Sequence, residues 1–248
     1  MSLKNRVAIV AGGGRDIGAA CAFELAAQGA SVVITYHSSA NGAQSVVDKI
    51  QSNGGNAIAL QADLTKPEDI ELTLSNTLKE FEKIDVLVHV SGGLIARKKV
   101  VESELEHWRE VMDVNLTSLF LMSRAVIPHL SKGGTIVTFS SQAARDGGGP
   151  GAVAYATSKG AVTTFTRALA KELGPDIRVN SVCPGMIKTK FHDDFTKDEV
   201  RHSVAQATVL KREGLAEEVA KVVAFLASED SSYMTGTNVD INGGLVFS

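Results

Sequence analysis

The chain has 248 residues, of which 44% are hydrophobic and 21% are charged, and its formal net charge is -3. This balance is ordinary for a globular protein and lacks the basic surface that nucleic-acid binding requires. No apolar run reaches the roughly 18 residues of a membrane-spanning helix. We therefore expect neither a nucleic acid nor a membrane as a partner.

The sequence contains two cysteines, Cys21 and Cys183, both in apolar segments. They form no CxxC pair and no Cys/His spacing suited to zinc, so we expect reduced, buried thiols and no metal site. Residues 1–6 lead directly into an apolar segment without the long apolar region of a signal peptide. A cytoplasmic location is the expectation.

Apolar segments of strand length alternate along the chain with longer segments whose apolar residues recur at helical spacing. Such alternation predicts βαβ units and a parallel sheet with helices on both faces. We expect strands at 7–10, 31–35, 57–60, 86–90, 135–139, 178–182 and 238–241, and helices at 17–28, 41–53, 67–82, 103–130 with a break, 155–173 and 215–227. Glycines at 29, 54, 55 and 174 mark expected helix ends.

This pattern predicts a three-layer α/β/α architecture with a doubly wound, parallel, seven-stranded sheet. No repeat or linker divides the sequence, so we expect a single domain over residues 1–248. Its cofactor half spans about 1–135 and its catalytic half about 136–248. Charged residues interrupt the pattern at 186–213, where we expect an active-site lid of short helices.

Residues 11–18, directly after the first expected strand, read Ala-Gly-Gly-Gly-Arg-Asp-Ile-Gly. Glycines at this position let the backbone approach a diphosphate, which binds at the N-terminus of the following helix. The loop therefore predicts a dinucleotide site and a Rossmann fold. A purely structural turn is the alternative interpretation of the glycines.

Tyr155 and Lys159 are spaced i and i+4, which places a phenol and an ammonium on the same face of one helix. The ammonium is expected to lower the pKa of the phenol, so that Tyr155 exchanges a proton with a substrate oxygen during hydride transfer. Ser141 follows the fifth strand, where its hydroxyl can donate to the same oxygen. Ser140 is the alternative for this role.

In these motifs the chain resembles the short-chain dehydrogenase/reductase family from Val7 to Gly244. Gly12 and Gly18 match the outer glycines of the family's loop, whereas Ala11 replaces its threonine and Asp16 its middle glycine. The catalytic set that the resemblance implies is Asn115, Ser141, Tyr155 and Lys159. In the family the asparagine holds a water that connects the lysine to solvent; a simple helix-kink role for Asn115 is the alternative.

The end of the second strand distinguishes between dinucleotides, because an acidic residue there accepts the ribose hydroxyls of NAD. This chain has Tyr36, His37 and Ser38 instead, and Arg15 lies in the glycine loop. NADP(H) is therefore favoured over NAD(H), although residues 37 and 38 can also be read as ordinary exposed loop residues. Asp16 is expected to cap the first helix, while Gly13 and Gly14 supply loop flexibility. Replacement of Asp16 by glycine is therefore expected to leave the affinity for the cofactor equal or better.

The resemblance implies further cofactor contacts beyond the glycine loop. Asp63 is expected at the adenine, with a turn-capping role as its alternative. Residues 89–92 replace the family's Asn-Asn-Ala-Gly, and His89 either takes over the lost polar bracing or is a hydrogen-bonded core histidine. The expected cofactor-binding residues are Gly12, Gly14, Arg15, Asp16, Ile17, Gly18, Tyr36, His37, Ser38, Asp63, Leu64, Ser91, Gly92, Tyr155, Lys159, Pro184, Gly185 and Thr189.

The substrate is the least determined feature. The chain is similar to 3-oxoacyl-(acyl-carrier-protein) reductases, which implies an NADPH-dependent reduction of a β-keto thioester, but Gly174-Pro175-Asp176 lacks the basic residue that would bind the acidic carrier. The alternative is a keto sugar acid, including those derived from uronates, bound by Arg97, Arg145 and His192.

A non-catalytic dinucleotide sensor or scaffold is an alternative from another functional class. The complete Asn-Ser-Tyr-Lys set argues against it, since a binding module has no need of the Tyr155/Lys159 pair. The resemblance also implies a homotetramer assembled through the long helices and the C-terminal strand.

Overall fold

The computed structural model describes residues 2–247, and its centre is a parallel sheet of order β3-β2-β1-β4-β5-β6-β7. Helices cover both faces of the sheet, and every residue of the inner strands β1 and β4 is buried. The strands are β1 (Val7–Ala11), β2 (Ser31–Tyr36), β3 (Ala57–Gln61), β4 (Ile84–His89), β5 (Leu130–Phe139), β6 (Ile177–Pro184) and β7 (Asn238–Ile241). This is the expected three-layer, doubly wound Rossmann architecture.

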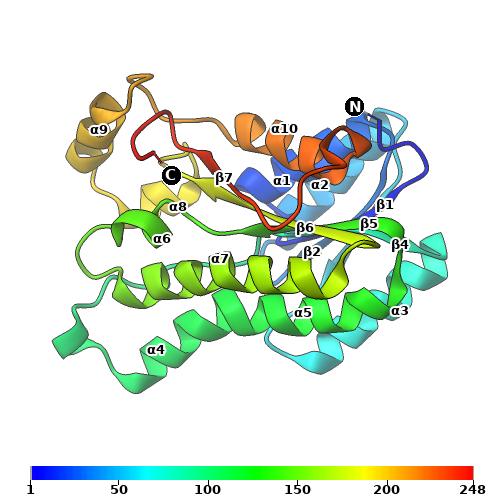
Figure 1. Cartoon of the computed structure of the whole chain (residues 1–248), viewed down its shortest axis with the longest axis horizontal. Helices are drawn as coiled ribbons and strands as arrows, with labels where there is room; N and C mark the ends of the chain where they lie inside the picture. Colours follow the sequence, from blue (N-terminus) through cyan, green and yellow to red (C-terminus); the bar gives the residue numbers. More distant parts are fainter. Residues whose placement is uncertain (1, 248) are drawn as a thin grey trace.

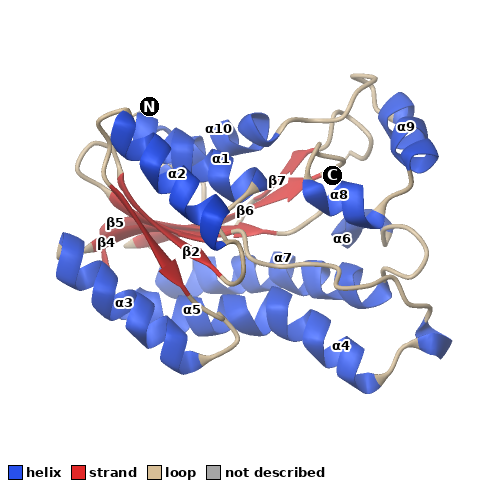
Figure 2. Ribbon diagram, turned by 180° about the vertical axis from the view of Figure 1, so that it is seen from behind, coloured by secondary structure: helices blue, strands red, loops and turns tan. Residues whose placement is uncertain are grey.

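Two helical layers enclose the sheet (Figure 1). One face carries α1 (Asp16–Ala27), α2 (Ala40–Ser52) and α10 (Ala216–Ala227), and the other carries α3 (Pro67–Phe81), α4 (Leu105–Met112), α5 (Ser118–Val126) and α7 (Val153–Leu173). Three short helices, α6 (Ala143–Asp146), α8 (Lys190–Phe195) and α9 (Asp198–Ala207), lie beyond one end of the strands (Figure 2). Single turns occur at η1 (Val100–Glu102), η3 (Ile127–His129) and η4 (Glu229–Ser231), and a π-helical segment, η2 (Asp113–Thr117), joins α4 to α5.

The hydrophobic core consists of two clusters, one on each face of the sheet. Alternate residues of a strand contribute to different clusters: Val86 and Val88 pack toward α1 and α10, whereas Leu87 packs toward α5 and α7. Both clusters contain fully buried aliphatic side chains from the central strand β1. The sheet is therefore a rigid support for the loops at its ends.

Several element boundaries differ from the sequence-based expectation. The expected helix over 103–130 ends earlier, and β5 begins at Leu130 rather than at 135. Gly29 and Gly54 adopt the left-handed conformation expected at helix ends, with φ of 97° and 81°. Gly174 does not, since its φ of -68° and ψ of 148° are extended. Segment 186–213 contains α8 and α9.

The register of the strands brings their carboxyl ends together at one edge. Ala11 pairs with His89, and His89 pairs with Thr138, so the loops after β1, β4 and β5 start at the same level. The backbone N–H groups of Val90 and Ser91 both donate to the carbonyl of Ala11 at 2.9 Å. Ligands of open α/β sheets bind at this edge, and the candidate site lies here.

Candidate active site

A cavity of about 650 Å³ lies at the carboxyl ends of the strands. Its walls come from the glycine loop, the ends of β2, β4, β5 and β6, the start of α7, and the lid helices α8 and α9. The volume is within the range of roughly 300–1,000 Å³ that is typical of small-molecule and cofactor sites.

The glycine loop is built for close backbone approach. Gly12 has a φ of 86°, and a Cβ on it would lie 2.9 Å from the Ser91 hydroxyl oxygen. A Cβ on Gly18 would lie 2.0 Å from the carbonyl oxygen of Gly12, so the start of α1 tolerates only glycine there. Gly13 is required for packing rather than flexibility, because its Cβ would meet Ile34 at 2.6 Å. These residues fit a bound diphosphate.

Asp16 does not cap α1, contrary to the expectation. Arg15 occupies the N-cap position and no side chain caps this helix end. Asp16 itself has a φ of 51°, its Oδ2 lies 3.1 Å from Arg15 Nη1, and its Oδ1 accepts a hydrogen bond of 3.1 Å from the backbone N–H of Lys190. The carboxylate therefore connects the glycine loop to the lid.

The adenosine side of the cavity only partly matches the expected contacts. Tyr36, His37 and Ser38 line the cavity, together with Arg15. Asp63 and Leu64 do not line it. The Asp63 carboxylate accepts hydrogen bonds from the N–H and the hydroxyl of Thr65, at 3.0 and 2.7 Å, and these bonds lower the pKa of Asp63. Asp63 therefore caps the turn, as the alternative interpretation expected. Leu64 is part of the hydrophobic core.

Tyr155, Ser141 and Lys159 meet at the wall formed by β5 and α7. All three line the cavity, and the Ser141 side chain interacts with the Tyr155 phenol. Lys159 Nζ lies 5.8 Å from the centre of the Tyr155 ring and donates to the carbonyl of Phe139 at 2.9 Å. The i and i+4 spacing thus places both side chains on the same side of α7.

Desolvation controls the charges of this pair. Burial raises the pKa of Tyr155, and its hydrogen bond with Ser141 acts in the opposite direction. Burial also lowers the pKa of Lys159 to about 8. The expected lowering of the tyrosine pKa by the neighbouring ammonium is therefore not found, since the phenol is desolvated and Lys159 is itself buried and bonded to a backbone carbonyl.

Asn115 lies in the π-helical segment η2 and clamps the loop after β4. Its Nδ2 donates to the carbonyls of Gly93 and Val111, each at 2.8 Å, and its Oδ1 accepts from the N–H of Gly93 at 3.1 Å. A Cβ on Gly92 would lie 2.4 Å from Asn115 Oδ1 and 3.1 Å from Lys159 Nζ. Asn115 therefore lies where the helix is distorted, as the helix-kink alternative expects, and it is also a close neighbour of Lys159.

Two polar residues beneath the site have different surroundings. The Ser140 hydroxyl contacts the Lys159 carbonyl and the Thr163 hydroxyl, each at 2.9 Å, which favours Ser141 as the substrate-facing serine. His89 is 2% exposed, and its Nε2 has no hydrogen-bond partner among the described residues 2–247. His89 is therefore not a fully hydrogen-bonded core histidine. Burial, followed by the nearby Lys159 charge, lowers its pKa to about 3.

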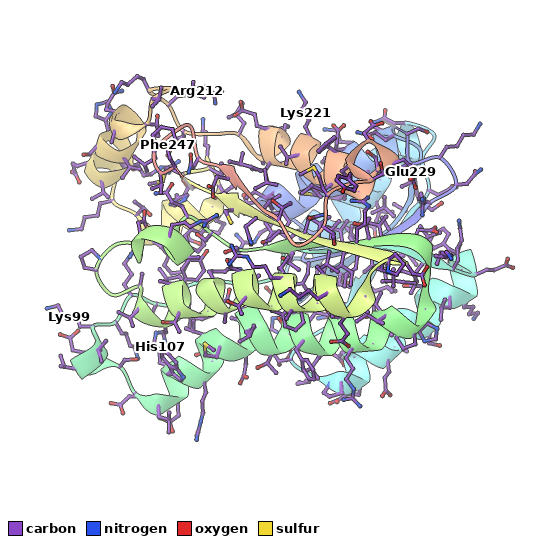
Figure 3. The ribbon with its side chains drawn as sticks, viewed as in Figure 1. Lys99, His107, Arg212, Lys221, Glu229 and Phe247 are labelled. Carbon is purple, nitrogen blue, oxygen red and sulfur yellow. The ribbon has the colours of Figure 1, made fainter. Side chains whose placement is uncertain are left out.

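The basic residues predicted to bind an anionic substrate are mostly engaged elsewhere. Arg145 does not line the cavity and pairs with Asp240 at 3.4 Å. Arg97 lines the cavity, but its Nε donates to the carbonyl of Phe195 at 2.9 Å and its Nη1 to that of Pro150 at 3.2 Å. Lys99, which is close to Arg97 in the sequence and is not among the predicted substrate residues, pairs with Glu102 and lies between β4 and α4 at the margin of the molecule (Figure 3).

His192 does line the cavity. Its Nδ1 is 3.0 Å from the Thr196 hydroxyl, and burial followed by the charge of Arg201 lowers its pKa to about 4. This imidazole is therefore neutral near pH 7 and suits a neutral polar group better than a carboxylate.

Sequence reasoning missed most of the apolar wall. The lid, the loop after β4, the start of α7 and the C-terminal segment contribute Leu94, Ala152, Met186, Phe191, Val200, Val204 and Leu245, and Gln142 adds an amide beside Ser141. Only the interruption of the apolar pattern by charged residues at 186–213 pointed to the lid. The remaining expected residues, Ile17, Gly14, Ser91, Gly92, Pro184, Gly185 and Thr189, all line the cavity.

Within residues 2–247, no group of three or more His, Cys, Asp or Glu side chains is arranged to hold a metal ion. Nor does any helix in this part of the chain combine the length and apolar character needed to cross a membrane. Cys21 and Cys183 are both free and buried.

The chain matches known proteins over almost its whole length. A family model described as enoyl-(acyl carrier protein) reductase matches residues 12–246. A 3-oxoacyl-[acyl-carrier-protein] reductase of Synechocystis sp. is 38% identical, with 99% of this chain and 98% of that protein covered. The chain belongs to the short-chain dehydrogenase/reductase family. As a family member, it is an NAD(P)-dependent oxidoreductase that acts on CH–OH and C=O groups.

Other proteins similar to this chain carry different names. Glucose 1-dehydrogenase 2 of Bacillus subtilis is 36% identical, with 98% of this chain and 95% of that protein covered. The solved short-chain dehydrogenase/reductase from Serratia marcescens is 33% identical with a TM-score of 0.94 and 99% coverage of each chain. A blue fluorescent protein from a metagenomic library, solved in complex with NADPH, is 33% identical with a TM-score of 0.93 and complete coverage of both chains.

Proposed function

We propose that this enzyme is an NADPH-dependent carbonyl reductase in which Tyr155 gives a proton to the substrate oxygen. The observation that carries the proposal is the convergence of Tyr155, Ser141 and Lys159 on one wall of the cavity whose other end is the glycine loop. The bound dinucleotide supplies the hydride. Ser141 donates a hydrogen bond to the substrate oxygen and orients the phenol, while Lys159 supplies positive charge beneath it.

The proton that leaves Tyr155 is replaced through Lys159. The lysine is buried, and a pKa of about 8 allows it to exchange a proton near neutral pH. A Cβ on Gly92 would meet both Asn115 Oδ1 and Lys159 Nζ, so the amide and the ammonium group lie close to the same piece of backbone after β4. We assign Asn115 the role of holding the loop after β4 in place beside Lys159.

NADPH is preferred over NADH in this proposal. The end of β2 presents Tyr36, His37 and Ser38 to the cavity rather than a carboxylate, and Arg15 lines the same region with 55% of its side chain exposed. An arginine is suited to binding a 2′-phosphate through two parallel hydrogen bonds. One solved relative is a complex with NADPH.

A 3-oxoacyl thioester is the favoured substrate. The lid side of the cavity is apolar, with Phe191, Val200, Val204 and Leu245 among its lining residues, and it suits an acyl chain. The Synechocystis relative is named for this activity. The keto sugar acid alternative has lost its main support, because Arg145 lies outside the cavity and Arg97 is bonded to two carbonyls.

The activity is tested by following NADPH oxidation at 340 nm with 3-oxoacyl thioesters, keto sugar acids and simple ketones, and by repeating the assay with NADH. We expect turnover with NADPH and a 3-oxoacyl thioester, and loss of at least about 10²-fold in kcat for Tyr155→Phe. NADPH binding without turnover of any carbonyl would favour the sensor or scaffold alternative.

We also propose a homotetramer in the cytoplasm. Apolar side chains are exposed along the segment from η1 to α5, including Val101, Leu105 and Phe120, and Tyr233 is fully exposed before β7. Patches of this kind mark protein interfaces. The two free buried thiols suit a reducing compartment. Light scattering coupled to size-exclusion chromatography gives the mass, and a mass near the 26.1 kDa of one chain would contradict the tetramer.

A further inference from the structure

The lid helix α8 has six residues, too few for a helix that is stable by itself. It nevertheless carries two side chains of the cavity wall, Phe191 and His192. The Phe191 ring packs on the catalytic-site phenol, with a centroid distance of 5.8 Å to Tyr155. The position of α8 therefore depends on contacts outside the helix.

The N-terminal end of α8 is held by the glycine loop. Lys190 is its first residue, and the backbone N–H of Lys190 donates to Asp16 Oδ1 across 174 positions of sequence. This N–H is one of the donors that a helix leaves without an internal partner. A carboxylate at this position also interacts favourably with the positive end of the helix dipole.

The C-terminal end of α8 is held by the loop after β4. Phe195 is its last residue, and the carbonyl of Phe195 accepts a hydrogen bond of 2.9 Å from Arg97 Nε. A cation is favoured at this end of a helix, where carbonyls lack internal partners. Arg97 Nη1 also donates to the carbonyl of Pro150 at 3.2 Å, which joins the lid to the loop between Ser141 and Tyr155.

We propose that Asp16 and Arg97 are positioning residues that clamp the two ends of α8 over the cavity, so that the wall containing Phe191 is formed before substrate binds. One clamp comes from the loop expected to hold the diphosphate and the other from the substrate side of the cavity. The clamp explains why an acidic residue occupies the glycine loop: its charge is directed at Lys190 N–H and Arg15.

The N-terminal clamp is tested with a pair of variants that separate the hydrogen bond from the side chain. Asp16→Asn keeps an Oδ1 acceptor for Lys190 N–H and tolerates the left-handed backbone. Asp16→Gly keeps that backbone conformation, with φ at 51° in the native chain, but removes the acceptor. Asp194→Asn is the matched control, since Asp194 lies on α8 and pairs only with Lys190 Nζ of the same helix, at 2.8 Å.

Amide hydrogen exchange of the cofactor-free protein measures the clamp without any assay of activity. In Asp16→Gly we expect the amides of Lys190 and His192 to exchange about tenfold faster than in the native protein. The Lys190 N–H loses its carboxylate acceptor, and a loosened helix end exposes the His192 N–H, which donates to the Thr189 carbonyl at 3.0 Å. Asp16→Asn is expected to retain most of the protection, and Asp194→Asn all of it.

The kinetic part of the inference rests on the proposed carbonyl reductase activity. Arg97→Ala and Asp16→Gly are expected to raise the KM for the carbonyl substrate about tenfold, with a smaller effect on kcat. The Kd for NADPH, measured by its fluorescence, is expected to stay equal or fall in Asp16→Gly, because a carboxylate beside the diphosphate site is removed. Lys99→Ala is the control for Arg97, since Lys99 pairs with Glu102 outside the cavity.

Two results would overturn the clamp. One is that Lys190 and His192 exchange at native rates in Asp16→Gly, and the other is that exchange is accelerated equally in Asp16→Gly and Asp16→Asn. An unchanged KM for the carbonyl substrate in Arg97→Ala would contradict the proposed role of Arg97 in positioning α8. If no carbonyl is reduced at all, the proposed function fails, but the exchange rates still decide whether Asp16 holds the lid.

Discussion

Ser140 and Ser141 are neighbours at the end of β5, but their hydroxyls have different surroundings. Ser140 is 4% exposed and is bonded to the Lys159 carbonyl and to Thr163, whereas Ser141 contacts Tyr155. Both serines line the cavity, but the Ser140 hydroxyl is engaged by these two partners, whereas the Ser141 hydroxyl lies beside the phenol. We therefore expect a structural role for Ser140 and a catalytic role for Ser141, and single substitutions can separate the two.

We predict that Ser141→Ala lowers kcat/KM by about 10²-fold or more and leaves the free energy of unfolding nearly unchanged. Ser140→Ala is expected to cost about 1–3 kcal/mol of stability, because the Lys159 carbonyl and Thr163 lose a buried partner, with a smaller loss of activity. Steady-state kinetics and urea unfolding measure the two effects. The opposite pattern would move the substrate-facing role to Ser140.

His89 links the stability of the fold to pH. The pKa of this imidazole is about 3 in the folded protein, against a usual value of about 6.5 in an unfolded chain. Between these values the unfolded chain binds a proton that the folded protein excludes. Stability is therefore fully present above about pH 6.5 and decreases as the pH falls toward 3.

We predict that His89→Asn removes this part of the pH dependence. Below pH 6.5, the native protein should lose about 1.4 kcal/mol more unfolding free energy per pH unit than the variant. Urea unfolding at pH 7.5, 6.0 and 5.0 measures the difference. His129→Asn is the control because His129 is exposed, and equal slopes for native protein and His89→Asn would show that His89 does not titrate as a buried group.

At the scale of elements, the turn after α10 depends on one side chain of β6. Arg178 donates from Nη2 to the carbonyls of Leu226 and Ser228, at 3.1 and 2.9 Å, and from Nη1 to the Ser231 hydroxyl and the Met234 carbonyl, at 2.9 and 3.2 Å. Leu226 lies in the last turn of α10, where carbonyls lack partners within the helix, and Ser228 and Met234 follow the end of that helix. Arg178 therefore fastens α10 and the segment leading to β7 onto the sheet.

We predict that Arg178→Lys lowers the unfolding free energy by about 1–3 kcal/mol. A lysine keeps the charge but cannot direct four donors in the plane of a guanidinium, so some carbonyls lose their partners. Chemical denaturation measures the loss. Arg167→Lys, on the exposed side of α7, is the matched control and should change stability by less than about 0.5 kcal/mol; similar losses in both variants would contradict the fastening role.

At the scale of the whole molecule, the sheet order joins the two halves of the chain. β4 from the first half pairs with β1 on one side and with β5 on the other, and both core clusters contain residues from both halves. Neither half can bury its apolar surface alone.

We therefore predict one cooperative unfolding transition. Far-ultraviolet circular dichroism reports all helices, and the fluorescence of Trp108, the only tryptophan, reports α4. The two urea curves should coincide at each of two protein concentrations, which separates unfolding from dissociation of an assembly. Two transitions, with one probe changing before the other, would show that the halves unfold independently.

The order of the elements and the centre of the site were predictable from the sequence. Apolar periodicity, the position of a glycine-rich segment between a strand and a helix, and the i and i+4 spacing of Tyr155 and Lys159 are local properties. They depend on bond geometry and on neighbours within a few residues. The strand positions, the glycine loop and the placement of Ser141, Tyr155 and Lys159 beside one cavity follow from them.

Only the tertiary structure decided where the charged side chains find their partners. Asp16 contacts a residue 174 positions away, Arg97 one that is 98 away and Arg145 one that is 95 away. The tyrosine pKa was mispredicted for the same reason, because the burial of Tyr155 depends on elements that pack around α7. Charge partners and desolvation depend on distances across the folded chain, and no local pattern of residues contains those distances.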